Sequence, residues 1–559
     1  MIIADKIRAA QTARGIAPED YPLSVASFAE LLDKRERESG GKTYLTYYDE
    51  SGARAEWTYA ECIGQARRFA AYFLAEGLRA GDRIATASHN HPDVIALYYG
   101  AWLADLCVAP LNMTEDDERL RYILANSGAK MLVCREEYAE RLAPLAPAGM
   151  RKTLVFDDAK REGGIHRLSR EAAPYRPELS PQEAAARLAA ERFVVYTSGT
   201  TGAPKGVVLL ERNILADSDA IARWHGIDAE TPMMCVLPLH HVNGVIVTHT
   251  TPLVAGASTT LNKKFQSEAF FARIESEGVH IVSVVPTLLA FLLETHKRTP
   301  LQTPPTLKYL ICGAGPLTCA LADEFETTFG ARVLHGYGLS ETTCYSCFLP
   351  VDLSEEEHRR WMQDYGFPSI GCPLPVNEMA IHDEKGNALP SGERGEIVAR
   401  GANVMKEYDR NPDANASAFA NGWFRSGDEG FFLQGEDGRP YFFITGRLKE
   451  LIIRGGVNLA PLEIDEILAR APGVKAGIAV GFENDFYGEE VGALVIPDSP
   501  NASKEAILDY CRAAMPFSKC PKVVVFTDAL PVTSTGKYQR NRVKHYFAEW
   551  KTEQFRKQA

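Results

Sequence analysis

The residues between Tyr196 and Val207 carry a dense set of polar groups suited to binding an anion. The run is Tyr-Thr-Ser-Gly-Thr-Thr-Gly-Ala-Pro-Lys-Gly-Val, which supplies hydroxyls at Thr197, Ser198, Thr200 and Thr201, glycines at Gly199, Gly202 and Gly206, and a cation at Lys205. Small residues let backbone N–H groups approach an anion closely, and hydroxyls and a lysine add further donors. This composition predicts a loop that holds a polyphosphate.

Two other interpretations of this loop are possible from its composition. A plain glycine-serine turn has a similar composition. A Walker A loop requires Gly-Lys followed by Ser or Thr, whereas Lys205 is preceded by Pro204 and followed by Gly206. The spacing therefore excludes the Walker A loop. Apolar runs on both sides, Arg-Phe-Val-Val-Tyr before and Val-Val-Leu-Leu after, predict that the loop joins two strands.

A second candidate site is the segment from Val333 to Thr343, Val-Leu-His-Gly-Tyr-Gly-Leu-Ser-Glu-Thr-Thr. Tyr337 offers a flat face on which a purine can stack, and its flanking glycines permit close approach. Glu341 supplies a hard oxygen ligand suited to Mg²⁺. Alone, the segment would equally fit a strand that ends in a glycine turn with a surface glutamate.

Three further polar residues lie downstream. Asp428, in Trp-Phe-Arg-Ser-Gly-Asp, has a carboxylate that can accept hydrogen bonds from two vicinal hydroxyls. Arg447 is a permanent cation suited to ribose or phosphate. Lys537 lies in the glycine-bearing stretch Pro-Val-Thr-Ser-Thr-Gly-Lys-Tyr-Gln-Arg. A single lysine in a loop is usually only solvated, so a catalytic role for Lys537 is expected only in combination with the other motifs.

Two histidines, His240 and His241, follow an apolar run in Leu-Pro-Leu-His-His-Val-Asn-Gly. The pattern predicts the end of a strand, where neighbouring side chains point to opposite faces, so the two rings are not expected to share a ligand. A metal site would need a third ligand at suitable spacing, and none is evident. A buried histidine with an ordinary hydrogen bond stays an alternative for His241.

A glycine-rich segment at 307–318, Leu-Lys-Tyr-Leu-Ile-Cys-Gly-Ala-Gly-Pro-Leu-Thr, imitates a dinucleotide fingerprint. That fingerprint requires Gly or Ala where Thr318 stands, and Pro316 would interrupt the pyrophosphate turn. A nicotinamide-binding function is therefore disfavoured.

Five of these motifs, which follow one another along the chain between 196 and 540, resemble those of the acyl-adenylate-forming superfamily, in particular its acyl-CoA synthetase branch. Weaker similarity extends back to about residue 57. The resemblance implies an ATP-binding loop at 197–205, an adenine wall at Gly313, Gly315 and Pro316, and further nucleotide contacts from Tyr337, Gly338, Ser340, Asp428 and Arg447. It also implies Mg²⁺ at Glu341, catalytic roles for Lys537, Thr342 and His241, a hinge at Lys449, and CoA contacts from Gly455, Gly456 and Asn458.

The elements that must position these residues follow from apolar spacing. Helical spacing over 60–78 is followed by a short buried strand over 83–88, and Pro286 is expected to end a strand and begin a helix. Ser354 and Glu357 form a capping-box pattern that predicts a short surface helix. The last hundred residues alternate strand and helix. We therefore expect a large multi-sheet α/β domain over 1–448 and a small mobile α+β domain over 449–559.

The composition of the chain limits the classes of protein to which it can belong. The chain has 559 residues and a formal net charge of −12, which argues against general binding to nucleic acid or to anionic membranes. We see no signal peptide and no uninterrupted apolar run of about eighteen residues, so the expectation is a cytoplasmic protein without an integral membrane segment. The eleven cysteines are expected to be free thiols, including the Cys344 and Cys347 pair.

The function that the resemblance implies is an ATP-dependent acid–thiol ligase. It would convert a carboxylic acid to an acyl-adenylate and pyrophosphate, and then transfer the acyl group to CoA. The expected acid is a medium-chain, long-chain or aryl monocarboxylate, because the apolar start of the helix after Pro286 offers no cation for a second carboxylate. A stand-alone enzyme that loads an acyl carrier protein is the alternative; a luciferase-type oxygenase and a nucleotide-binding protein without activity are disfavoured. A homodimer is left open.

Overall fold

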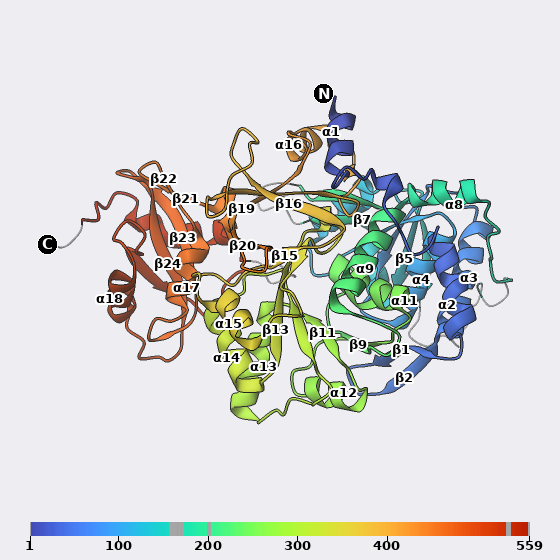
Figure 1. Cartoon of the computed structure of the whole chain (residues 1–559), viewed down its shortest axis with the longest axis horizontal. Coiled ribbons are helices and arrows are strands. Elements are labelled where there is room, and N and C mark those ends of the chain that lie inside the picture. The colour runs from blue at the N-terminus through green and yellow to red at the C-terminus, as the bar shows by residue number, and fades with distance from the viewer. Residues whose placement is uncertain are drawn as a thin grey trace.

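The computed structural model describes residues 2–155, 165, 169, 173–197, 203–532 and 538–556. Figure 1 shows the N-terminal part of the chain (blue to yellow) forming the large body of the molecule, with the C-terminal part (orange to red) beside it at one end. The expected division into a large α/β domain and a smaller C-terminal domain is therefore confirmed.

The largest sheet in the described part of the chain is mostly parallel. Strands β1, β10, β9, β11, β12 and β13 pair in parallel, whereas β2, β14 and β15 pair antiparallel. Its nine strands, in spatial order, are β15 (Cys372–Pro373), β14 (Cys347–Phe348), β13 (Arg332–Tyr337), β12 (Tyr309–Cys312), β11 (Ile281–Val284), β9 (Met233–Cys235), β10 (Thr259–Asn262), β1 (Thr43–Tyr48) and β2 (Arg54–Thr58).

A second sheet carries the strands that flank the hydroxyl-rich loop. Strands β7, β4, β3 and β5 are parallel and mostly buried, as expected of a sheet that is covered on both faces, whereas β8 pairs antiparallel with β7. Its seven strands, in spatial order and within the described residues, are β18 (Glu407–Tyr408), β8 (Lys205–Leu210), β7 (Glu191–Thr197), β4 (Cys107–Pro110), β3 (Arg83–Ala87), β5 (Met131–Arg135) and β6 (Arg151–Val155).

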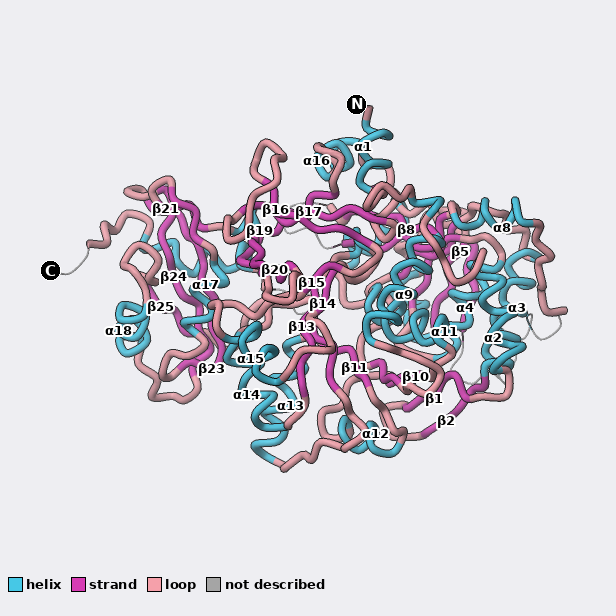
Figure 2. Tube along the Cα trace, in the orientation of Figure 1, coloured by secondary structure: helices cyan, strands magenta, loops and turns pink. Residues whose placement is uncertain are grey.

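Two antiparallel arrangements follow along the chain. A four-stranded sheet contains β16 (Asn377–His382), β17 (Gly395–Gly401), β19 (Phe424–Gln434) and β20 (Pro440–Arg447). The C-terminal sheet contains β22 (Val457–Leu459), β21 (Ile452–Arg454), β24 (Gly488–Pro497) and β23 (Val474–Asn484), with β25 (Val523–Phe526) pairing in parallel with β24. In Figure 2 the strands of this last sheet (magenta) stand side by side at the C-terminal end of the molecule.

Helices cover these sheets. Those before the C-terminal region are α1 (Ile3–Ala10), α2 (Phe28–Ser39), α3 (Tyr59–Ala75), α4 (Pro92–Leu103), α5 (Asp117–Asn126), α6 (Glu136–Leu142), α8 (Pro181–Leu188), α9 (Glu211–His225), α10 (Val242–Val245), α11 (Thr251–Ala255), α12 (Phe270–Ser276), α13 (Pro286–Arg298), α14 (Cys319–Phe329), α15 (Glu355–Gln363) and α16 (Pro412–Ala418). The C-terminal region adds α17 (Pro461–Leu468) and α18 (Lys504–Ala514). None of the helices in the described ranges is both long and apolar enough to cross a membrane.

Local signals in the sequence explain several helix boundaries. Pro286 occupies the first turn of α13, where the missing N–H of proline costs nothing. Ser354 and Glu357 form the expected capping box of α15. The expectation that α15 lies on the surface was only partly right, because Trp361 is buried and stacks on Tyr441 with ring centroids 3.8 Å apart. One face of this helix is therefore part of the core, and the other is exposed.

All eleven cysteines are buried free thiols. Burial raises the pKa of Cys344 and of Cys347 well above the ordinary thiol value. Because the thiolate is the reactive form, both side chains act as small apolar groups.

A buried carboxyl joins the C-terminal region to the large domain. Both carboxyl oxygens of Glu466, on α17, lie 3.0–3.1 Å from the backbone N–H of Cys319, at the start of α14. An anion at a helix N-terminus is stabilised by the peptide dipoles. The carboxyl group is nevertheless almost fully buried, and burial raises the pKa of Glu466 to about 8. Burial outweighs the opposing effect of the hydrogen bond from Cys319, so the Glu466 carboxyl group stays largely protonated near neutral pH.

Glu466 predicts a specific pH dependence of stability. Its folded-state pKa of about 8 exceeds the ordinary value of 4.5, so the folded protein binds more protons than the unfolded chain and loses stability as pH rises between these values. The loss amounts to about 5 kcal/mol at most. Replacing Glu466 by Gln should flatten the fall of the thermal midpoint between pH 6 and pH 9. The exposed Glu505→Gln change is the control; equal slopes for both variants and the wild type would refute this assignment.

Candidate functional site

The hydroxyl-rich loop follows β7 and precedes β8, and these two strands pair antiparallel. Thr197 and Lys205 are opposite each other at the loop end of this strand pair, so the predicted strand–loop–strand arrangement is confirmed. Ser198, Gly199, Thr200 and Thr201 lie outside the described residues. A Cβ on Gly206 would come within 3.0 Å of Val194, so the packing at the base of the loop favours glycine there.

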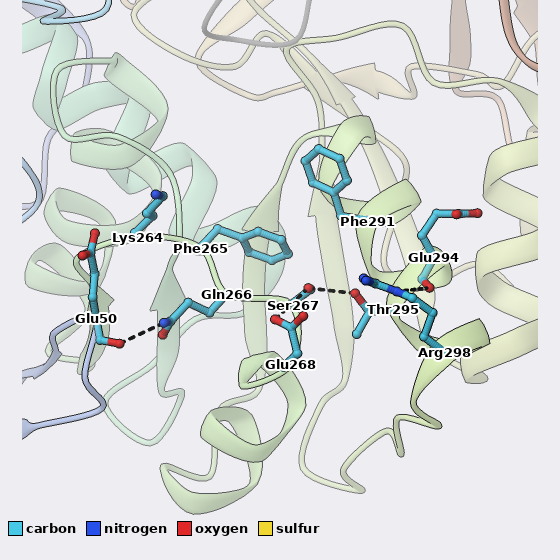
Figure 3. Close-up of a pocket in the computed structure, with 10 residues that line it drawn as sticks. All are labelled: Glu50, Lys264, Phe265, Gln266, Ser267, Glu268, Phe291, Glu294, Thr295 and Arg298. Carbon is cyan, nitrogen blue, oxygen red and sulfur yellow. Dashed lines mark hydrogen bonds between the residues drawn. The ribbon is translucent and has the colours of Figure 1, made fainter. Parts of the chain in front are cut away.

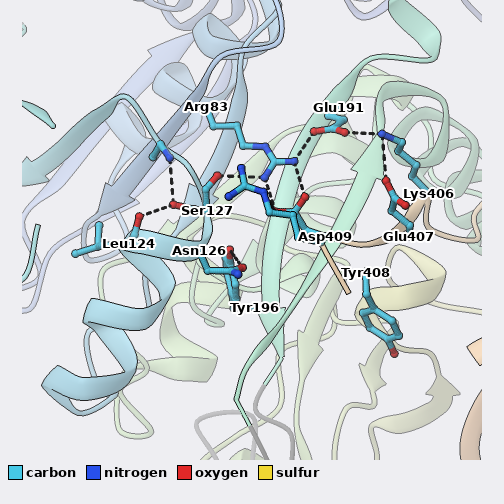
Figure 4. A network of polar contacts seen from close by, with 12 residues as sticks. Arg83, Leu124, Asn126, Ser127, Glu191, Tyr196, Lys406, Glu407, Tyr408 and Asp409 are labelled. Carbon is cyan, nitrogen blue, oxygen red and sulfur yellow. Dashed lines mark hydrogen bonds and ion pairs between the residues drawn. The ribbon is translucent and has the colours of Figure 1, made fainter. Parts of the chain in front are cut away.

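Ion pairs fix the strands at the base of this loop. Figure 4 shows Arg83, on β3, binding both carboxylate oxygens of Asp409 at 2.6 and 3.0 Å and reaching Glu191 at 2.7 Å. Lys406 binds the other oxygen of Glu191 at 2.7 Å. Such partly buried contacts, one of them bidentate, fix the relative orientation of the joined segments as well as their distance. They hold β18 against β8, so that Tyr408 is opposite Val207.

Tyr408 lies between two residues that the motifs single out. The ammonium of Lys205 lies 4.7 Å from the centroid of the Tyr408 ring, and the Tyr408 hydroxyl donates to Oε1 of Glu341 at 2.8 Å. Tyr408 and Glu341 are both buried. Lys205 and Glu341 thus contact one tyrosine, Lys205 at the face of its ring and Glu341 at its hydroxyl. Sequence reasoning missed Tyr408, which lies in no polar motif.

The turn that carries Glu341 is tightly constrained. A Cβ on Gly338 would lie 2.0 Å from the carbonyl oxygen of Cys344, so glycine is obligatory in this packing. Thr343 has φ +65°, a conformation that is costly for a β-branched residue. Its hydroxyl is held by the carbonyl oxygen of Asn403 at 2.7 Å, and Asn403 also donates to buried Asp217 at 3.2 Å.

Thr342 and Ser340 lie in the same turn. The Thr342 hydroxyl accepts from the backbone N–H of Leu339 at 3.1 Å and from the Ser346 hydroxyl at 3.0 Å. Thr342 is buried, so its hydroxyl shapes the turn in this structure. Ser340, which begins the 3₁₀ turn Ser340–Thr342, is half-buried.

Tyr337, Asp428 and Arg447 converge beside this turn. The Tyr337 hydroxyl donates to Oδ2 of Asp428 at 2.7 Å, and Nε of Arg447 lies 3.3 Å from Oδ1. Asp428 and Arg447 are direct partners in the pairing of β19 with β20. The carboxylate raises the pKa of Arg447, and burial, followed by the same carboxylate, raises that of Tyr337. Within the described chain, Oδ1 of Asp428 accepts no hydrogen bond, which leaves an acceptor available.

The predicted wall residues Gly313, Gly315 and Pro316 lie in the loop between β12 and α14. A Cβ on Gly313 would lie 2.5 Å from the Tyr345 hydroxyl and 2.7 Å from the carbonyl oxygen of Gly336. The backbone of this loop therefore packs directly against the strand that ends in Tyr337. Gly315 and Pro316 are half-buried.

The prediction for the two histidines was wrong in its geometry. His240 and His241 lie in a turn before α10, and their ring centroids are only 4.3 Å apart. The alternation of a strand therefore does not separate them. Burial holds the pKa of His240 well below its ordinary value, which keeps this imidazole neutral.

A buried polar chain lies close to these histidines in sequence. Asn243 donates to the Tyr345 hydroxyl at 3.1 Å and accepts from the Ser283 hydroxyl at 2.8 Å. All three side chains are buried. The chain connects α10, β11 and the turn after Glu341, and it borders the Gly313 loop through Tyr345.

The residues predicted to contact CoA and the predicted hinge are not brought to this place. Gly455, Gly456 and Asn458 lie on the exposed hairpin of β21 and β22, which Figure 1 shows well apart from β13. Lys449 is exposed in the short 3₁₀ turn Leu448–Glu450. Lys537 lies outside the described residues, although the flanking Val532 and Tyr538 form a bridge.

A surface cleft of about 490 Å³ lies elsewhere, between the segment after β10 and helix α13 (Figure 3). Its lining mixes two cations, three glutamates and two phenylalanines, and includes Lys264, Glu294 and Phe291. It contains none of the residues predicted from the motifs. We therefore place the candidate site at the Lys205, Glu341 and Asp428 cluster.

Comparisons with known proteins identify the family of this chain. The family model described as AMP-binding enzyme matches residues 32–409, and the AMP-binding enzyme C-terminal domain matches residues 463–537. A probable CoA ligase of Humulus lupulus is 32% identical over 93% of this chain and 94% of its own length. The sulfoacetate–CoA ligase of Cupriavidus necator is 32% identical over 93% and 98%, and the oxalate–CoA ligase of Arabidopsis thaliana is 31% identical over 85% and 90%.

Solved structures show the same relationship. ATP-bound MatB from Rhodopseudomonas palustris superposes with a TM-score of 0.81 at 26% identity, covering 93% of this chain and 99% of that chain. MenE from Bacillus subtilis, in complex with ATP and magnesium, gives 0.77 at 26% identity and covers 92% and 99%. The expectation of an acyl-adenylate-forming enzyme with CoA ligases among its relatives is confirmed: the chain belongs to the AMP-binding enzyme family.

Proposed function

We propose that this protein is an AMP-forming acyl-CoA ligase that activates a monocarboxylic acid. The observation that carries the proposal is the convergence of Lys205, Glu341 and Asp428 around tightly packed glycine turns. A carboxylate must attack the α-phosphate of ATP although both are anions. The site must therefore neutralise charge and hold the reactants in line.

The chain's own residues divide these tasks. Asp428 retains an acceptor at Oδ1 that suits a ribose hydroxyl, with Arg447 beside it. The half-buried ring of Tyr337, oriented by its hydrogen bond to Asp428, supplies a face for adenine. Lys205 and the hydroxyls of the adjoining loop would hold the phosphates. His241 and the Asn243 chain would border the acid.

Glu341 fits a magnesium ion bound together with ATP. The structure shows no cluster of three or more candidate metal ligands among the described residues, so Glu341 would share the ion with phosphate oxygens. Mg²⁺ is commonly held by one or two carboxylates plus substrate phosphates. When bound, it would offset the charge that pyrophosphate carries away. MenE, a structural neighbour, is described in complex with ATP and magnesium.

The second half-reaction requires a different arrangement of the C-terminal region. We place the domain boundary between 448 and 449, with Lys449 absorbing the rotation. The exposed hairpin that carries Gly455, Gly456 and Asn458 would then move to the acyl site, where its glycines leave room for a pantetheine arm. Lys537 would leave the site in the same movement.

The acid is proposed to be a medium-chain, long-chain or aryl monocarboxylate. The buried residues of α13 are all uncharged: Pro286, Leu288, Leu289, Leu292, Leu293 and Thr295. A second carboxylate would need a cation on this wall. Two relatives are named for small dianionic acids, sulfoacetate and oxalate, so these acids belong in the test.

The first prediction concerns the overall reaction. Purified protein with ATP, Mg²⁺ and CoA should release AMP and pyrophosphate and form a thioester with monocarboxylates, and less efficiently with oxalate or sulfoacetate. Chromatography of nucleotides and thioesters measures all products. Pyrophosphate release without a thioester would favour loading of a carrier protein, and preferential use of a dianion would refute the proposed acid class.

The second prediction separates the half-reactions. Lys537→Ala should reduce acyl-adenylate formation about 100-fold or more, because a cation at the transferring phosphate is lost. Thioester formation from supplied acyl-adenylate should stay close to wild type, since Lys537 is proposed to be absent from that step. Lys544→Ala, on a lysine that pairs with Glu489, is the matched control. Equal losses in both half-reactions would contradict the assignment.

The third prediction concerns the nucleotide. Asp428→Asn should weaken ATP and AMP binding about tenfold or more, because a charge-assisted acceptor and the partner of Arg447 are lost together. Isothermal calorimetry with AMP isolates this effect from the phosphate loop. The exposed Asp413→Asn change serves as a control. Unchanged AMP affinity in the folded Asp428→Asn variant would remove Asp428 from the site.

A further inference from the structure

Tyr408 contacts both the cation and the carboxylate on which charge neutralisation is proposed to depend. The Lys205 ammonium lies over its ring at 4.7 Å, and its hydroxyl donates to Glu341 at 2.8 Å. The structure records no ion pair between Lys205 and Glu341 themselves. We propose that Tyr408 is a positioning residue that keeps these two opposite charges apart, so that both remain free to bind MgATP. This inference rests on the proposed function.

The physical reason lies in what the two charges would do without the ring. A lysine and a glutamate brought together in a partly buried site attract each other strongly. A direct ion pair would neutralise both charges, and ATP phosphates and Mg²⁺ would have to break it in order to bind. The aromatic face instead offers the ammonium a weak cation–π contact that a phosphate can displace.

The hydroxyl of Tyr408 has a separate effect. It engages one carboxylate oxygen of Glu341, Oε1, while the Glu341 carbonyl accepts from the N–H of Met405 at 2.8 Å. The side chain and the backbone of Glu341 are therefore both held by the segment that ends in β18. This fixes the orientation of the carboxylate before an ion binds, which lowers the cost of binding.

Tyr408 is itself placed by the contacts of its neighbour in sequence. Asp409, the next residue, is bound by Arg83, and its backbone N–H donates to the carbonyl oxygen of Gly206 at 2.7 Å. Gly206 directly follows Lys205. The ring, the phosphate-loop cation and the metal ligand are thus tied to one rigid strand pair, which is the arrangement that accurate positioning requires.

Two substitutions separate the ring from the hydroxyl. Tyr408→Phe keeps the face for Lys205 and loses the bond to Glu341, so the Mg²⁺ concentration for half-maximal ATP binding should rise about tenfold. Tyr408→Leu also removes the face and permits a direct Lys205–Glu341 pair, so MgATP affinity should fall about fivefold further. Calorimetric binding of ATP at several Mg²⁺ concentrations measures both effects without relying on turnover.

The controls make the result specific. Tyr441→Phe is a matched change, because Tyr441 is also buried and donates to a carboxylate, Asp437, at 2.7 Å, but lies among the core aromatics. In a Glu341→Gln background, Tyr408→Phe should have almost no further effect on Mg²⁺ dependence, since the two act as one unit. Thermal midpoints identify any loss of folding.

The outcomes are distinguishable. If wild-type protein binds no MgATP, the proposed function fails. If it binds MgATP and Tyr408→Phe shows the same Mg²⁺ dependence as Tyr441→Phe, only the role of Tyr408 fails. Additive effects of Glu341→Gln and Tyr408→Phe would likewise overturn it.

Discussion

The close approach of backbone segments at Gly338 is the constraint on which the site depends. No side chain fits there, since a Cβ would lie 2.0 Å from the carbonyl oxygen of Cys344. The contact folds the chain after β13 back on itself, so that Tyr337 and Glu341, four residues apart, contact Asp428 and Tyr408 respectively. The same fold-back forces Thr343 to φ +65°. That strain is balanced by buried hydrogen bonds from Thr343 and Asn403.

Charge is distributed in matched pairs around this turn. Asp428 is opposed by Arg447, Asp409 by Arg83, and Glu191 by Lys406, whereas Lys205 and Glu341 meet only through an aromatic ring. The paired charges hold strands in place. The two that stay unpaired with each other are those proposed to meet phosphate and magnesium. A site that must bring two anions together needs charges that are not already paired within the protein. A charge in a structural ion pair is not free to interact with the substrate.

The sequence predicted much of this arrangement, and the failures have physical reasons. Motifs that are contiguous in sequence, such as the loop after Thr197 and the turn after Tyr337, carry their own signals in glycines and hydroxyls. The strand–loop–strand at 197–205 and the helix that begins at Pro286 were predicted correctly for that reason. The His240 and His241 prediction was wrong because an apolar run was taken to continue as a strand, whereas Pro238 leads into a turn.

Tyr408 could not be predicted from local pattern. Its role arises from pairing of β18 with β8, almost two hundred residues away in sequence, and from ion pairs that place that strand. Likewise, Glu466 caps α14 across the boundary between the two parts of the chain, which no local spacing reveals. Trp361 of α15 was assigned to a surface helix because charged residues dominate its surroundings in sequence; its burial follows from stacking on Tyr441. The positions of Tyr408, Glu466 and Trp361 all depend on contacts between residues that are distant in sequence.

The central claim is that the acid is activated as an acyl-adenylate. It is tested most directly by carrying out the complete reaction with the best carboxylate labelled with ¹⁸O in its carboxyl group, followed by mass spectrometry of the products. Attack of the carboxylate on the α-phosphate transfers one labelled oxygen to AMP, and this is the predicted result. Label in inorganic phosphate with ADP as the nucleotide product, or unlabelled AMP, would contradict the account.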